Sequence, residues 1–100
     1  MVVEEVIQYY RALTRSDRER VYLAGISPDD DKERWYFEAV RDRNELVAIR
    51  QITVEADGTR HCYWAEHMED DWGGLTDQAI DYEDQLRQCA EAEFLAAWDG

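Results

Sequence analysis

The chain has 100 residues, of which 45% are hydrophobic and 12% aromatic, and its formal net charge is −13 at pH 7. This length and apolar content are typical of one folded domain spanning residues 1–100, and they exclude a disordered chain. A domain of this size buries one modest core, without room for a large internal active site as well. The negative charge excludes direct binding of nucleic acid and favours a positively charged partner.

The first quarter of the chain predicts helix. Apolar residues recur at spacings of three and four in residues 2–13, which is the pattern of an amphipathic helix. Ser16 and Glu19 form a capping-box pattern, so a second helix is predicted to begin at Asp17. In the interpretation that we favour, residues 21–26 continue that helix, and a short strand is the alternative.

Three strands are predicted in the middle of the chain. Residues 35–41, 46–56 and 59–67 are rich in aromatic and β-branched side chains. Asp57-Gly58 separates the last two segments and predicts a two-residue type I′ turn, because both residues tolerate a positive φ. The three segments therefore predict an antiparallel meander.

The Asp57-Gly58 turn also predicts a strand register. In a two-residue turn Glu55 faces Arg60, and Ile52 faces Tyr63. One face of the hairpin is then expected to point to the core, and the other to be wetter. The predicted core side holds Ile52, Val54, His61, Tyr63 and Ala65, and the wetter side holds Gln51, Thr53, Glu55, Arg60, Cys62 and Trp64.

The last third of the chain predicts a loop followed by helix. Residues 69–74 combine a charge run with Trp72 and two glycines, which suits a loop. A helical pattern returns over residues 77–98, as one helix or as two abutting helices. The predicted fold class is therefore α+β, with an N-terminal helix or helices, a three-stranded antiparallel β-meander, and a C-terminal helix or helices packed on one sheet face.

Three stretches together resemble a known family. They are residues 45–54 followed by Asp57-Gly58 and Tyr63, then residues 74–80, and then Glu93-Phe94 followed by Trp98. Their order is similar to that of a family of small bacterial domains of uncharacterised function, some of which look like immunity proteins of toxin systems. The resemblance covers about residues 35–98, and it implies the fold more than the immunity function. The chain has Ala79 or Asp81 where the family tends to have a proline, and no family residue roles are carried over.

The histidines and cysteines do not predict a catalytic or metal site. His61 and Cys62 are neighbours in a predicted strand and point to opposite faces, so they cannot form a nucleophile–base pair. His67 lies about 20 Å further along the same strand, so the two imidazoles cannot share one metal ion. The chain also lacks a calcium-binding loop and a phosphate-binding loop. We therefore predict no enzymatic activity, no metal and no cofactor.

Negative charge is concentrated in the last forty residues. Residues 61–100 carry eleven carboxylates against Arg87 alone and account for −10 of the net charge, whereas residues 1–60 are nearly balanced. A surface that serves only solubility mixes both signs, so this asymmetry favours a docking surface. Trp64 and Trp72 are either core residues or interface anchors within an acidic rim. The predicted contact patch is Glu66, Glu69, Asp70, Asp71, Trp72, Asp77 and Asp81.

Two functions fit this pattern. The favoured hypothesis is an immunity protein that neutralises a basic toxin by covering its active site. The alternative is a phage-type DNA mimic, such as an anti-restriction or anti-CRISPR protein, whose carboxylates on residues 77–98 imitate phosphates. We expect that reversing Glu69, Asp70 and Asp71 to lysine slows association and leaves the fold intact. Acidic residues near the start argue against a signal peptide, so we also expect a cytoplasmic protein with reduced cysteines.

Overall fold

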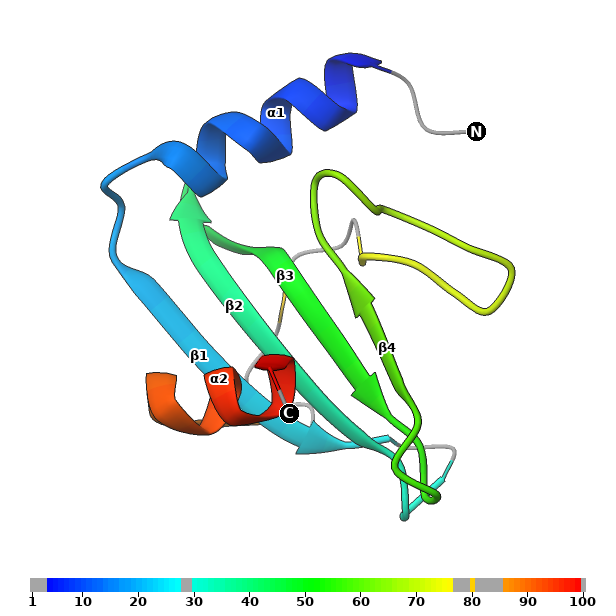
Figure 1. The fold of residues 1–100 in the computed structure, drawn as a ribbon. Helices are drawn as coiled ribbons and strands as arrows, with labels where there is room; N and C mark the ends of the chain where they lie inside the picture. The colour runs from blue at the N-terminus through cyan, green and yellow to red at the C-terminus, as the bar shows by residue number, and fades with distance from the viewer. Residues whose placement is uncertain (1–3, 28–29, 77–79, 81–85, 100) are drawn as a thin grey trace.

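The computed structural model describes residues 4–27, 30–76, 80 and 86–99. Its elements are α1 (Glu4–Arg15), β1 (Arg20–Ile26), β2 (Arg34–Asp42), β3 (Glu45–Val54), β4 (Arg60–Tyr63), β5 (Leu86–Gln88) and α2 (Glu91–Asp99). Within the described residues the strands form a five-stranded sheet in the order β4-β3-β2-β1-β5, with all neighbours antiparallel (Figure 1). The prediction of a three-stranded meander is therefore wrong, although the protein is α+β.

Residues 20–26 form β1, not the second helix that the sequence favoured. This strand is hydrogen-bonded to β2 on one side and to β5 on the other. Its middle residues are buried on both sheet faces, and a short continuous apolar run of this kind is common to central strands and buried helices. The Ser16 hydroxyl donates to the carbonyl of Leu13 (2.7 Å), so it closes the end of α1 instead of capping a new helix.

The predicted helical region 77–98 also contains a strand. Residues 86–88 are β5, which pairs with β1, and residues 91–99 form α2. The rest of the predicted helix, at 77–79 and 81–85, lies outside the described residues. β5 is too short to show a period in its sequence, and its pairing with β1 joins distant parts of the chain.

Glu55 and Thr59 are still paired beyond the ends of β3 and β4, so the turn between them is residues 56–58 and the predicted hairpin register is wrong by one position. Glu55 N–H donates to the Thr59 carbonyl (2.8 Å), and Gly58 N–H donates to the Glu55 carbonyl (2.9 Å). Gly58 has a φ of 91°, as expected for a three-residue loop that ends on a left-handed residue. The observed pairs are Val54–Arg60, Thr53–His61, Ile52–Cys62 and Gln51–Tyr63.

That shift separates residues that the sequence placed together on one core face. Ile52 lies on the face covered by α2, where it packs with Tyr22 and Phe94, and we call this the helix face. Tyr63 packs with Leu23 on the opposite face, which we call the hairpin face. Both Ile52 and Tyr63 have no exposed surface, so both faces of the sheet are covered.

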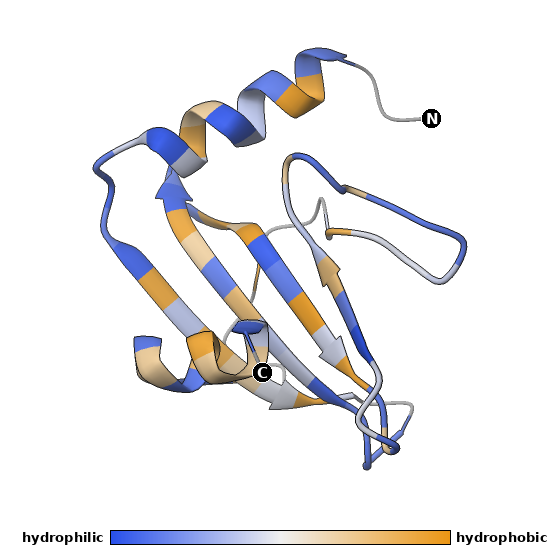
Figure 2. Ribbon diagram, in the orientation of Figure 1, coloured by the Kyte–Doolittle hydropathy of each residue, from blue (hydrophilic) through white to orange (hydrophobic). Residues whose placement is uncertain are grey.

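The two sheet faces are covered in different ways. α2 lies across the helix face, while α1 crosses one end of the sheet, where Leu13 packs on Val40 and Ile49 (Figure 1). On the hairpin face the chain after β4 folds back, and its Leu75 and Ile80 pack into the core. Figure 2 shows that this returning segment is mostly hydrophilic, whereas apolar residues recur along the strands. A polar segment is therefore held against the sheet by a few apolar contacts.

Candidate functional site

Residues 68–75 form a small β-hairpin, which we call the acidic hairpin. Leu75 N–H donates to the Met68 carbonyl (2.8 Å), and Glu69 and Gly74 form a bridge between the two arms. A Cβ at position 74 would lie 2.9 Å from the Met68 carbonyl oxygen, so glycine allows the arms to approach this closely. The two glycines that predicted a loop therefore belong to an ordered hairpin.

Gln51 of β3 fixes the acidic hairpin to the sheet. Its amide nitrogen donates to the Gly74 carbonyl (3.2 Å), and its amide oxygen accepts from Thr76 N–H (2.8 Å). One side chain thus satisfies both a backbone donor and a backbone acceptor of the returning segment. The hairpin is held on β3 as well as being joined to β4.

Asp70 builds the turn of the acidic hairpin. Its Oδ1 accepts hydrogen bonds from the Tyr63 hydroxyl (2.9 Å), Trp72 N–H (2.9 Å) and Gly73 N–H (3.0 Å). The hydrogen bond from Gly73 N–H, with those from Tyr63 and Trp72, lowers the pKa of the Asp70 carboxyl. Replacing Asp70 by lysine would remove these acceptors. We therefore expect the triple reversal to weaken the turn of the acidic hairpin as well as to change the surface charge.

Trp72 lies flat on His61 at the tip of the acidic hairpin. The two ring centroids are 3.7 Å apart and the rings are within 5° of parallel. The imidazole is oriented by Glu55, whose Oε2 lies 2.9 Å from His61 Nε2. Trp72 nevertheless remains 46% exposed. It is therefore a positioned aromatic side chain with a solvent-facing surface.

Trp64 has the opposite environment. Its ring packs edge-on against Trp98 of α2, with the centroids 5.5 Å apart. It is also close to His67, at a centroid distance of 5.4 Å. Of the two tryptophans whose role the sequence left open, Trp64 therefore packs against a helix, whereas Trp72 remains partly exposed.

Glu66 forms an ion pair with Arg11 at the protein surface. Its carboxylate accepts from the Arg11 guanidinium, with Nε 3.0 Å from both carboxylate oxygens. This contact joins α1 to the turn after β4, and it lowers the pKa of the Glu66 carboxyl. The pairing with Arg11 thus uses most of the hydrogen-bonding capacity of this carboxylate.

The residues of the predicted contact patch fall into three groups, according to where the structure places them. Glu69, Asp71 and Trp72 come together as exposed side chains of the acidic hairpin. Glu66 and Asp70 make internal contacts. Asp77 and Asp81 lie outside the described residues. The candidate site is therefore the hairpin tip.

The cysteines are placed away from the histidines. His61 stacks on Trp72 on the hairpin face, whereas Cys62 packs with Phe94 on the helix face. Burial raises the pKa of the thiols of Cys62 and Cys89, which disfavours the reactive thiolate. In the part of the chain that the structure describes, no three His, Cys, Asp or Glu residues form a group that could hold a metal ion.

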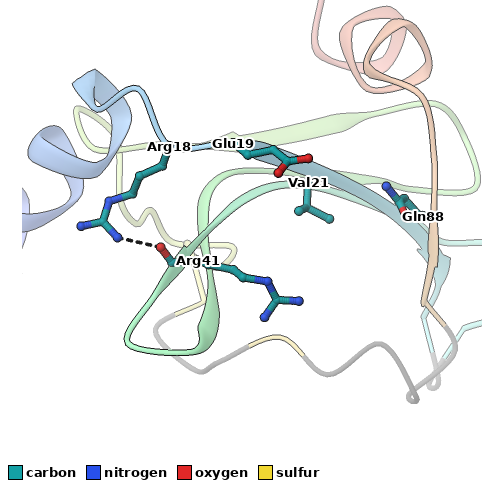
Figure 3. Close-up of a pocket in the computed structure, with 5 residues that line it drawn as sticks. All are labelled: Arg18, Glu19, Val21, Arg41 and Gln88. Carbon is teal, nitrogen blue, oxygen red and sulfur yellow. Dashed lines mark hydrogen bonds between the residues drawn. The ribbon is translucent and has the colours of Figure 1, made fainter.

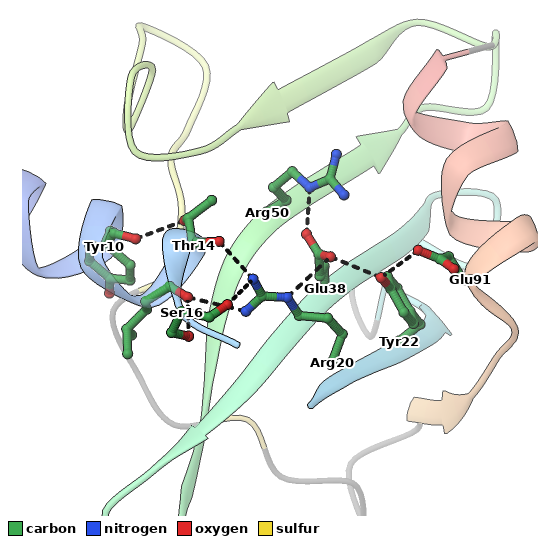
Figure 4. A network of polar contacts seen from close by, with 9 residues as sticks. Tyr10, Thr14, Ser16, Arg20, Tyr22, Glu38, Arg50 and Glu91 are labelled. Atoms are coloured by element: carbon green, nitrogen blue, oxygen red, sulfur yellow. Dashed lines mark hydrogen bonds and ion pairs between the residues drawn. The ribbon is translucent and has the colours of Figure 1, made fainter. Parts of the chain in front are cut away.

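A polar network on the helix face was not expected from the sequence (Figure 4). Glu38 of β2 is 5% exposed, and its carboxylate accepts from Arg50 Nε (2.5 Å) and the Tyr22 hydroxyl (2.9 Å). Arg20 Nε lies 4.0 Å from the same carboxylate. The buried charge is therefore paired and hydrogen-bonded. We call these four residues and Glu91 the Glu38 network.

The Glu38 network reaches both helices. The guanidinium of Arg20 donates to the carbonyls of Leu13, Thr14 and Ser16 at the end of α1. On the other side, the Tyr22 hydroxyl lies 3.0 Å from a carboxylate oxygen of Glu91 at the start of α2. Burial and the hydrogen bond to Glu38 raise the pKa of Tyr22. The network therefore connects α1, the sheet and α2.

Arg50 adds a second contact with α2. Its guanidinium carbon lies 5.0 Å from the ring centroid of Phe94 and 4.9 Å from that of Trp98. These distances are within the range of cation–π attraction. The signal in the sequence was Glu38 itself, an acid in the middle of an apolar strand, which needs a cationic partner from elsewhere in the chain.

Comparison with known proteins found no matching family model, no matching curated protein and no matching solved structure. The resemblance to immunity-like bacterial domains therefore stays a prediction. Among the described residues, no helix has the length and apolar character needed to cross a membrane. The candidate site has to be interpreted from its own chemistry.

Proposed function

We propose that this protein is a small acidic inhibitor that docks on a basic protein through the tip of the acidic hairpin. The observation that carries the proposal is Trp72, which is stacked on His61 yet 46% exposed, next to the exposed acids Glu69 and Asp71. Binding hot spots favour tryptophan within a polar rim. The specific form that we propose is an immunity protein that covers the active site of a toxin.

Preorganisation supports this function. A side chain already held in one orientation loses little conformational entropy when a partner covers it, so more of the contact energy becomes affinity. His61, which Glu55 orients, supports one face of the Trp72 ring, and Gln51 holds the hairpin backbone. The tip of the acidic hairpin is thus preorganised for binding.

Charge supports the same function through the rate of encounter. Residues 61–100 account for −10 of the net charge, and a field of one sign steers a partner of the opposite sign. The active sites of enzymes that cut or bind nucleic acid are positively charged, so they fit this surface. We place the encounter in the cytoplasm, where such targets occur.

The first test is protection in cells. The product of the neighbouring gene is expressed alone and together with this chain, and growth is measured. If that product is the toxin, co-expression restores growth, and the Trp72→Ala variant restores much less. A wild-type chain that gives no protection and no complex with that product would refute the immunity function.

The second test separates the hairpin from general charge. Association with the toxin is followed by stopped-flow fluorescence for the wild type and for two variants. One is Glu69→Lys/Asp71→Lys in the acidic hairpin, and the other is a control with equal charge change, Asp31→Lys/Glu45→Lys. All four positions are exposed, and the control pair lies outside the acidic hairpin. We expect the hairpin variant to associate at least about tenfold more slowly than the control variant. Equal rates for the two variants would contradict docking at the tip.

The number of partners distinguishes an immunity protein from the alternative, a DNA mimic. A DNA mimic should displace DNA from several nucleic-acid-binding proteins, whereas an immunity protein recognises one cognate partner. The mimic hypothesis relied on residues 77–98, of which 77–79 and 81–85 lie outside the described residues. Displacement of duplex DNA from unrelated binding proteins would favour that alternative.

A further inference from the structure

The edge of β1 is only partly covered by β5. β1 runs over Arg20–Ile26, but its pairing with β5 is limited to Leu23–Gln88, Ala24–Arg87 and Gly25–Leu86. One further bond, from Cys89 N–H to the Tyr22 carbonyl (2.8 Å), ends the ladder before the chain enters α2. Among the described residues, the first part of β1 therefore has no strand on this side.

Strand geometry shows which backbone groups are available there. In an antiparallel sheet the N–H and C=O of alternate residues point to the same side of the strand. Because the Tyr22 carbonyl points toward β5, the N–H and C=O of Arg20 point in the same direction, to the uncovered edge. An extended segment placed there can form two backbone hydrogen bonds with Arg20.

A groove of about 500 Å³ lies beside this part of the edge, lined by Arg18, Glu19, Val21, Arg41 and Gln88 (Figure 3). In Figure 3 the Arg41 side chain extends on one side of Val21, while Glu19 and Gln88 lie on the other. Arg18 is held at the groove by two contacts of Nη1. It donates a hydrogen bond to the Arg41 carbonyl (2.7 Å) and forms an ion pair with Asp42 Oδ1 (3.4 Å). The groove thus combines an apolar residue with two guanidinium groups, and the Glu19 carboxylate and the Gln88 amide complete its lining.

The Arg41 guanidinium favours a negatively charged group in this groove. Arg18 is already paired with Asp42, whereas no hydrogen bond or ion pair engages the Arg41 guanidinium within the described residues. A guanidinium in this state is a good donor to a carboxylate, which it can bind through two parallel hydrogen bonds. An acidic group on the added segment would therefore pair with Arg41, on the side of Val21 that faces away from the Glu19 carboxylate (Figure 3).

We propose that the groove beside β1 binds an extended peptide segment, which adds to the sheet as a strand along β1 and places a carboxylate on Arg41. Backbone pairing with Arg20 would supply the alignment, and Val21 would contact an apolar side chain of the segment. This site is at the β5 edge of the sheet, whereas the acidic hairpin follows β4 at the opposite edge. It is therefore independent of the proposed inhibitor function.

The test uses two synthetic pentapeptides with blocked ends, acetyl-Thr-Val-Thr-Val-Glu-amide and the same peptide with glutamine in place of glutamate. Each is titrated into the ¹⁵N-labelled full chain, and amide chemical shifts are recorded. We expect saturable shifts at the amides of Arg20, Val21 and Gln88, with about tenfold tighter binding of the glutamate peptide. This comparison needs no variant.

Two variants with equal charge change locate the carboxylate. Arg41→Gln should reduce the affinity for the glutamate peptide to that of the glutamine peptide. Arg43→Gln, an exposed position in the β2–β3 turn and outside the groove, should leave the affinity within about twofold. Shifts that do not saturate at millimolar peptide, shifts centred on β4, or equal losses in the two variants would each overturn the proposal.

Discussion

Single acidic residues in and just before the acidic hairpin have different roles, although all carry the same charge. Asp70 accepts three hydrogen bonds through one oxygen, and Glu66 binds Arg11. Asp71 and Glu69 remain exposed beside Trp72. A carboxylate that satisfies backbone N–H groups is costly to replace, whereas an exposed one contributes little to stability. The two kinds can be distinguished by substitution.

The two neighbouring glycines provide a matched test at this scale. In Gly74→Ala the new Cβ would lie 2.9 Å from a backbone oxygen of Met68, whereas in Gly73→Ala the nearest atom is the Tyr63 hydroxyl at 3.4 Å. We expect Gly74→Ala to lower the free energy of unfolding by about 2 kcal/mol, and Gly73→Ala by less than about 1 kcal/mol. Urea unfolding of both variants measures this. Equal costs would contradict the hairpin geometry.

Asp70 predicts an acid-dependent loss of stability. Because its pKa is lower in the folded protein than the ordinary 3.8, the folded state binds the proton more weakly than the unfolded chain. Its stabilisation is therefore complete above pH 3.8 and is lost as the pH falls through the lowered folded value. Asp70→Asn keeps an oxygen acceptor but does not titrate. The stability difference between wild type and Asp70→Asn should shrink between pH 5 and pH 2.5, and a constant difference would refute this role.

At the scale of elements, the Glu38 network joins parts that make few other contacts with one another. Arg20 binds the carbonyls at the end of α1, and the Tyr22 hydroxyl reaches Glu91 of α2. Both contacts lead to one buried carboxylate on β2. Loss of the charge at Glu38 should therefore lower the stability of both helices.

Glu38→Gln tests this coupling. Removing the charge leaves the guanidinium groups of Arg20 and Arg50 without their counter-ion, so we expect a loss of about 3 kcal/mol of unfolding free energy. Hydrogen exchange should become faster both in the last turn of α1 and in α2. Glu45→Gln, at an exposed position, is the control and should change neither. Faster exchange in only one helix would contradict the coupling.

At the scale of the whole molecule, charge is distributed unevenly along the chain. The net charge of −13 creates self-repulsion in the folded state, and most of it comes from residues 61–100. The same field that would attract a basic partner therefore lowers stability. Salt screens both effects, so it should act in opposite directions on folding and on association.

Raising NaCl from 20 mM to 500 mM should stabilise the free protein, by an amount on the order of 1 kcal/mol. The urea midpoint measures this change. The Glu69→Lys/Asp71→Lys variant is less negative and should gain less from the same salt. An unchanged midpoint in the wild type would show that self-repulsion is negligible.

Local patterns in the chain are enough to predict α1, β2 and β3, because amphipathic spacing and β-branched runs act within a few residues. The third predicted strand, 59–67, is too long, since β4 ends at Tyr63 and Trp64 and His67 are hydrogen-bonded to each other in a tight turn. Local patterns also indicate that the acids after residue 60 form a candidate binding surface. They do not show that Asp70 and Glu66 are engaged in hydrogen bonds within the protein. Those hydrogen bonds depend on Tyr63 and Arg11, which come from other elements.

Tertiary contacts decided the rest. Residues 20–26 became a strand because β2 and β5 offer hydrogen bonds on both sides, and residues 86–88 became a strand because β1 accepts them. One extra loop residue at Gly58 moved Ile52 and Tyr63 to opposite faces, which is possible because both faces are covered. Trp72 has one face of its ring stacked on His61, which comes from β4, and it stays 46% exposed. Such choices depend on residues far apart in the chain, so only the assembled sheet could make them.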